Sequence, residues 1–183
     1  MAWKPYSFLK MKIFFLFFLN CLFIIAQKED RYKMKFVSLI DFEIVIGTEE
    51  NGTNEKAPFG FALHTYGGLK FTRRMTLSAG TGIIRSFNKQ SWAIPLIADF
   101  RWYLNPIGYQ SPYMFINTGK YLDIGDSFST GQTAKLGLGY LIESDYNFFY
   151  TIELFRFSRT FNLKNSASNF FVNGIGFALR IRL

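Results

Sequence analysis

The feature that most constrains the fold is an alternation of apolar with small or polar residues, which runs along most of the 183-residue chain. A period of two is typical of β-strands, because successive side chains of a strand point to opposite faces. No helical stripe of comparable length competes with it. Eight segments carry the alternation: Lys35–Ile46, Phe59–Phe71, Met75–Phe87, Trp92–Leu104, Tyr113–Ile124, Gln132–Ile142, Phe148–Phe161 and Phe170–Leu183.

The two faces of these segments differ in character. In the last segment, Phe177 and Leu179 lie on one face, whereas Ala178, Arg180 and Arg182 lie on the other. A membrane barrel turns its apolar face outward, and a soluble barrel that binds a small apolar ligand turns it inward. The alternation alone does not distinguish these two arrangements.

The glycines favour the membrane barrel. A narrow closed barrel has a crowded interior, where glycine leaves room for longer side chains. On a water-exposed face, glycine would only weaken the strand. Three pairs lie on the polar faces: Gly80 and Gly82, Gly137 and Gly139, and Gly174 and Gly176. We therefore expect the charged face inside and the aromatic face in lipid, with the soluble barrel as the alternative.

Eight strands are enough to close a membrane barrel, and closure is needed because an open edge would leave backbone groups unpaired in hydrocarbon. The sequence therefore predicts an all-β, eight-stranded, antiparallel, up-and-down transmembrane β-barrel. Amphipathic aromatic rings near strand ends predict interfacial girdles. These rings belong to Trp92, Trp102, Tyr103, Tyr113 and Tyr140.

The amino-terminal segment has the layout of an export signal. Three lysines and no acid precede an apolar run over residues 13–26, which is shorter than the roughly 20 residues that a spanning helix needs. The small residue Ala26 marks the expected cleavage site, and translation could start at Met1 or Met11. The predicted organisation is a signal peptide (1–26), a short periplasmic segment (27–34) and the barrel (35–183).

Composition excludes several kinds of site. Cys21 and His64 are the single cysteine and histidine, so the chain has neither a disulfide framework nor a Cys/His zinc site. Without the signal peptide, 18 basic and 13 acidic residues remain, with no dense basic cluster. This balance gives no indication of nucleic-acid binding, and we expect no cofactor and no resident metal.

Three stretches carry a resemblance to a known family: the signal ending Ala26-Gln27, the run Asp99–Asn105 leading into Ser111-Pro112-Tyr113, and the terminal strand Gly174–Leu183. Through them the chain resembles the small outer-membrane β-barrel proteins of Gram-negative bacteria, the OmpA/OmpX-like group and the "outer membrane protein beta-barrel domain" proteins. The resemblance covers essentially the whole mature chain. It implies an outer-membrane location, with lipid and the barrel assembly machinery as partners. Such proteins usually end in an aromatic residue, where this chain has Leu183.

The polar faces place a set of charges inside the predicted barrel. Charges removed from bulk water need partners, so the simplest arrangement is a salt-bridged plug that blocks conduction. A narrow ion path or a binding site is the alternative. The predicted lumenal charges are Asp41, Glu43, Lys70, Asp99, Arg101, Lys135, Glu153, Arg180 and Arg182.

Catalysis would need several of these polar residues to converge. His64 lies on a polar face and could act with Ser78 and Glu43 in a lipid-modifying site near one rim. A single histidine within a lumenal hydrogen-bonded network is the commoner arrangement. We therefore predict a monomeric, non-enzymatic protein with a structural or surface-interaction role.

Two positions do not fit the pattern. Arg156 falls on the lipid face unless a bulge near Phe155 shifts the register or its side chain reaches the outer rim. The segment Tyr113–Ile124 is apolar on both faces, so its orientation stays open.

Overall fold

The computed structural model describes residues 33–49, 59–86, 91–105, 110–122, 128–143, 149–163 and 169–182. The predicted signal peptide, most of the segment 27–34 and Leu183 lie outside these ranges. Within them, no helix is long and apolar enough to span a membrane. The strands are β1 (Lys35–Glu49), β2 (Phe59–Lys70), β3 (Met75–Ser86), β4 (Ser91–Ala93), β5 (Pro95–Tyr103), β6 (Ser111–Tyr121), β7 (Phe128–Glu143), β8 (Phe149–Leu163) and β9 (Asn169–Arg182).

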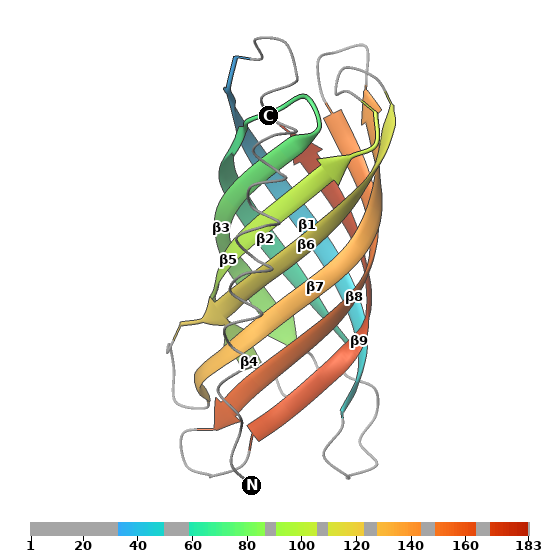
Figure 1. Cartoon of the computed structure of the whole chain (residues 1–183). Coiled ribbons are helices and arrows are strands. Elements are labelled where there is room, and N and C mark those ends of the chain that lie inside the picture. Colours follow the sequence, from blue (N-terminus) through green and yellow to red (C-terminus); the bar gives the residue numbers. More distant parts are fainter. Residues whose placement is uncertain are drawn as a thin grey trace, which may run out of the picture.

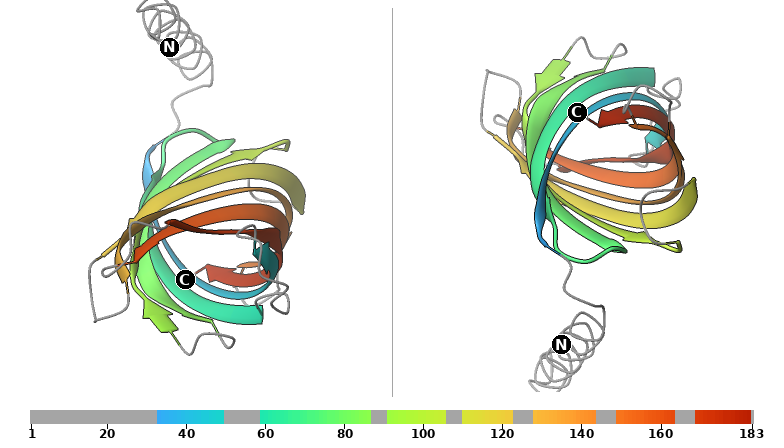
Figure 2. Two further views of the ribbon diagram at one scale, coloured as in Figure 1. Left: turned by 90° about the horizontal axis from the view of Figure 1, so that it is seen from below. Right: turned by 90° about the horizontal axis from the view of Figure 1, so that it is seen from above.

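The strands form one closed antiparallel sheet. The strands pair in chain order, with β4 and β5 both pairing with β3, and β1 pairs with β9 to complete the ring. Figure 1 shows the strands running obliquely around the barrel, and the end-on views in Figure 2 show the ring that they enclose. The predicted up-and-down barrel is confirmed.

The strands β4 and β5 form one strand of the barrel, so the ring has eight. Both pair with β3 in a single register, because Ala93 lies opposite Ile84 and Leu96 lies opposite Thr81. The interruption falls beside Pro95, which has no N–H to donate to the ladder. The Pro95 carbonyl instead accepts a hydrogen bond of 2.9 Å from Thr81 Oγ1.

The register fixes the tilt of the strands. Stepping from partner to partner around the barrel from Leu39 leads back to β1 at Glu49, ten residues further along. With a rise of about 3.3 Å per residue and a strand spacing of about 4.8 Å, this stagger tilts the strands by about 40°. The path passes through Leu39, Tyr66, Gly80, Ile97, Gly119, Thr133, Arg159, Val172 and Glu49.

The outer wall is apolar and the interior carries the charges. Large side chains such as Leu138 and Leu154, at 63% and 65% exposure, project outward, whereas Asp41, Asp99 and Arg180 are almost completely buried. This is the arrangement of faces that a membrane barrel requires and the inverse of the soluble alternative.

The structure also settles the two positions that the sequence left open. In β6, Tyr113 and Phe115 point inward, while Met114 and Ile116 are exposed on the outer wall. In β8, the register is unbroken at Arg156, which is exposed. The proposed bulge near Phe155 is therefore wrong, and Arg156 lies on the outer wall.

Strand β7 begins four residues earlier than the alternation predicts, at Phe128 instead of Gln132. The polar sequence before Gln132 resembles a loop, but its backbone continues the ladder, with Thr130 opposite Asn162 and Gly131 opposite Phe161. A register shift lies between Phe128 and Thr130. The additional residues of this strand are mostly polar. Because they lack the alternation of apolar and polar residues, the sequence pattern did not predict that they belong to a strand.

Candidate functional site

The centre of the interior is built around Arg101 of β5. Its guanidinium donates hydrogen bonds of 2.7 Å to Asp99 Oδ2 and Glu153 Oε1, and one of 3.1 Å to the Tyr113 hydroxyl. The Tyr113 hydroxyl in turn donates to Glu153 Oε1 at 2.6 Å. Each of these four side chains is almost fully buried. They join β5, β6 and β8 from inside the barrel.

Arg180 of β9 extends the same cluster to the other side of the interior. Its Nη2 lies 2.9 Å from Asp41 Oδ2, and its Nη1 lies 3.4 Å from Asp99 Oδ2. Its Nε lies 3.5 Å from Glu153 Oε1. One guanidinium therefore contacts carboxylates from β1, β5 and β8, which are brought together only by closure of the barrel.

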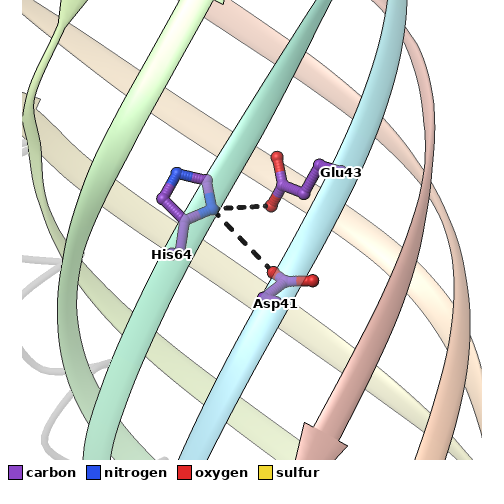
Figure 3. A group of neighbouring side chains, drawn as sticks. All are labelled: Asp41, Glu43 and His64. Atoms are coloured by element: carbon purple, nitrogen blue, oxygen red, sulfur yellow. Dashed lines mark ion pairs between the residues drawn. The ribbon is translucent and has the colours of Figure 1, made fainter.

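A second group of charges surrounds Glu43 of β1. Lys135 Nζ forms an ion pair with Glu43 Oε1, and Arg159 Nη2 lies 3.8 Å from Glu43 Oε2. His64 Nδ1 lies 3.3 Å from Glu43 Oε1 and 3.9 Å from Asp41 Oδ2, as drawn in Figure 3. His64 thus lies between the two groups. Together they form the ionic network: Asp41, Glu43, His64, Asp99, Arg101, Tyr113, Lys135, Glu153, Arg159 and Arg180.

The trio in Figure 3 could in principle hold a metal, because Asp41, Glu43 and His64 place one ligand atom each within 4.8 Å of one another. However, Lys135 and Arg180 already contact the two carboxylates. A divalent cation would have to displace these charges from a buried interior. The arrangement therefore suits internal charge compensation better than a metal centre.

The three residues considered for catalysis, His64, Ser78 and Glu43, come together only in part. His64 approaches Glu43, but both lie deep in the interior and not at a rim. Among the described residues, Ser78 Oγ has no hydrogen-bond partner, and His64 Nδ1 approaches Glu43 and Asp41 instead. A serine nucleophile needs a hydrogen-bonded base, and this geometry does not supply one.

Beside the ionic network lies a second structure that the sequence did not predict. Phe115 of β6 packs against Phe155 of β8 with ring centroids 6.3 Å apart, and Tyr121 stacks on Phe161 at 4.7 Å. We call this set the aromatic cluster, and it lines the interior along β6 and β8. Its members are Tyr113, Phe115, Tyr121, Phe155, Phe157 and Phe161.

The strand between β6 and β8 makes room for these rings. A Cβ added to Gly137 of β7 would lie 2.7 Å from atoms of both Phe115 and Phe155. One added to Gly131 would lie 2.8 Å from the Tyr121 ring. Small residues on β7 therefore allow large rings on its two neighbours, the packing typical of narrow barrels.

Cations of the ionic network lie over rings of the interior. Arg159 Cζ is 4.6 Å from the Phe157 ring centroid, and Lys135 Nζ is 5.3 Å from that of Phe155. Such cation–π contacts gain strength where water is excluded. The two parts of the interior thus share one packed core.

The predicted lumenal charges all lie on inward-facing positions, although not all join the network. Lys70 is buried at the end of β2, and Arg182 is half-buried with its Cζ 5.1 Å from the Phe149 ring centroid. The sequence prediction omitted Arg159, which is buried and faces Glu43. Arg159 follows Glu153 by six residues, and this even spacing places both side chains on the same face of β8. The alternation of the sequence therefore already indicated that Arg159 points inward.

Two members of the predicted aromatic girdle are wrong. Tyr103 and Tyr113 are buried inside the barrel, with ring centroids 5.0 Å apart. Since Tyr103 is two residues from Arg101, alternation places both on the inner face. Trp92, Trp102 and Tyr140 are exposed on the outer wall near strand ends, with Trp92 at the opposite end of the barrel from Trp102.

Comparisons with known proteins find similarity in the fold. No protein-family model matches the chain, and no curated protein sequence matches it. The crystal structure of Neisserial surface protein A is similar with a TM-score of 0.47 and 13% identity, covering 83% of this chain and 99% of that one. The N-terminal β-barrel domain of Pseudomonas aeruginosa OprF gives 0.36 and 15%, covering 80% and 99%. These likenesses are too distant to assign a family.

Proposed function

We propose that the protein is a non-enzymatic outer-membrane barrel whose interior is closed by side chains, and that it acts as a structural or surface-interaction component of the cell envelope. One observation carries this proposal: large apolar side chains cover the outer wall while buried ion pairs fill the interior. In water this arrangement would expose the apolar wall, whereas in lipid it satisfies both faces.

The closed interior argues against a pore. Arg180 contacts Asp41 and Glu153 on the two neighbouring strands and Asp99 across the interior, and Arg101 occupies the space beside it. Eight strands leave little more room than side chains fill. Ions would therefore have to separate buried charge pairs in order to pass.

Fractionation tests the location. The proposal predicts that the protein is found in the outer-membrane fraction and that its unboiled form migrates differently in dodecyl sulfate gels from its boiled form. A periplasmic protein that stays soluble without detergent would contradict it.

Conductance and lipid chemistry test the role. In planar bilayers, the purified protein should give no steady ion-conducting steps. Incubation with phospholipids should release neither fatty acid nor an acylated product, both for the wild-type protein and for His64→Ala. Steady conductance, or a lipid reaction that His64→Ala abolishes, would replace the proposed role with a pore or an enzyme.

A further inference from the structure

The outer wall is not evenly covered by large side chains. A groove with a volume of about 530 Å³ crosses β3, β5, β6 and β7. The outward-facing Ala79, Ala98 and Thr118 line it, and Lys120 and Gln132 lie at its edge.

The register of the barrel creates this groove. Ala79 lies directly opposite Ala98, and Ala98 lies opposite Thr118, so small side chains form a continuous floor across three strands. Because it follows the interstrand hydrogen bonds, the floor runs perpendicular to the tilted strands and therefore obliquely to the barrel axis. Rows of larger residues flank it: Leu77, Phe100, Ile116 and Leu136 on one side, and Leu96, Lys120 and Gln132 on the other.

The two ends of the groove differ in depth along the barrel. Lys120 is one residue from the end of β6, whereas Ala79 is the fifth of the twelve residues of β3 and lies near the middle of that strand. The groove therefore runs from the level of a strand end into the apolar belt. A bound lipid would have its headgroup at Lys120 and a chain along Ala98 and Ala79.

The charge at the edge of the groove identifies the headgroup. Lys120 and Gln132 are cross-strand partners, so an ammonium and a side-chain amide project outward together. A cation on the lipid face is strongly unfavourable at the bilayer midplane and costs little near the interface. Their N–H groups are suited to phosphate oxygens, and an anion there would offset the cost of the charge.

We propose that this groove binds one phosphate-bearing lipid, with its phosphate at Lys120 and Gln132 and one acyl chain along the floor formed by Thr118, Ala98 and Ala79. Contact with the floor supplies dispersion attraction, which drives association inside a membrane where burial from water no longer contributes. The inference rests on the proposed membrane location and adds to it a specific lipid partner.

Native mass spectrometry of the whole protein in an uncharged detergent tests this site. Dioleoyl phosphatidic acid is the probe, dioleoylglycerol has the same chains without phosphate, and inorganic phosphate supplies the headgroup alone. We expect one phosphatidic acid to be retained at least ten times more strongly than dioleoylglycerol, without competition from inorganic phosphate. Equal retention of the two lipids, or displacement by inorganic phosphate, would overturn the proposal.

Matched variants locate the binding. Lys120→Met should weaken retention about ten-fold or more, Lys120→Arg should preserve it, and Ala98→Leu should weaken it by filling the floor. Two controls change the outer wall elsewhere and should leave retention unchanged: Arg156→Met removes an outward cation on β8, and Thr65→Leu enlarges an outward residue on β2.

Equal losses for Lys120→Met and Arg156→Met would contradict a local site and indicate general attraction of anions. The same preparations separate this inference from the proposed function. A heat-modifiable, detergent-dependent barrel that retains no phosphatidic acid would contradict the lipid site alone. A protein that is soluble without detergent would contradict the membrane location itself.

Discussion

The ionic network and the aromatic cluster fill the same interior by different physical means. In the network, four buried acids meet four buried cations, and each charge depends on partners from other strands. In the cluster, rings from β6 and β8 pack into the space left by glycines on β7. Losing a member of the network leaves an uncompensated charge, whereas losing a ring leaves a void. The following substitutions separate these two costs.

The largest effect is expected from breaking the network at its centre. Arg101→Met leaves Asp99 and Glu153 without their main partner, and removing one member of a buried ion pair costs about 3–5 kcal/mol. Urea unfolding of the protein in lipid vesicles measures this loss. Arg182→Met, at a half-buried position outside the network, is the control and should cost much less. Equal costs would contradict the central role of Arg101.

A void in the aromatic cluster should cost slightly less. Phe155→Ala removes a ring that is 3% exposed and packed against Phe115 and Phe157, for an expected loss of about 3 kcal/mol. Phe177→Ala is the matched control on the outer wall, at 47% exposure, where lipid can occupy the vacated space. The same unfolding assay should rank Phe155→Ala as the more damaging change. The reverse order would place the cluster outside the core.

Tyr113 belongs to both parts of the interior and should show their coupling. Tyr113→Phe keeps the ring but removes hydrogen bonds with Arg101 and Glu153, at an expected cost of about 2 kcal/mol. Combined with Arg101→Met, its effect should differ from that of the same change made alone, because Arg101 and Tyr113 share the Glu153 carboxylate as a partner. Tyr103→Phe serves as the control for loss of a buried hydroxyl. Strict additivity of the Arg101 and Tyr113 changes would show that the two parts are independent.

The smallest effect tests the space beside the rings. Gly139→Ala places a methyl group against Cζ, the hydroxyl oxygen and Cε2 of Tyr113, with Cε2 at 2.7 Å from the added Cβ and the other two atoms closer, at an expected cost of about 1 kcal/mol or more as the ring shifts. Gly67→Ala adds the same methyl group on the outer wall, where its nearest neighbour is Phe36 Cζ at 3.4 Å. The melting temperature should fall for the first variant only. A fall of the same size for both would attribute the effect to backbone propensity.

The contrast also shows what the sequence could predict. Asp99 and Arg101 alternate with apolar residues, so their inward orientation follows from period two and the cost of charge in lipid. Phe115 and Ile116 are both apolar, and either could face lipid or fill the interior. Only the closed barrel decides between them, because Gly137 of the adjacent strand leaves space for a ring on the inner side. Likewise, the partners of Arg180 come from the three strands β1, β5 and β8, and sequence spacing does not reveal which carboxylates meet it.

Tryptophan fluorescence tests the orientation of the two faces most directly. Beyond residue 26, the tryptophans are Trp92 and Trp102, and both lie on the outer wall near opposite ends of the barrel. For the chain without residues 1–26, reconstituted in vesicles that contain brominated phospholipids, we predict strong quenching of both residues. Bromine near the headgroup should quench more than bromine at the chain end. Fluorescence unchanged by brominated lipid would contradict a barrel whose aromatic face lies in the membrane.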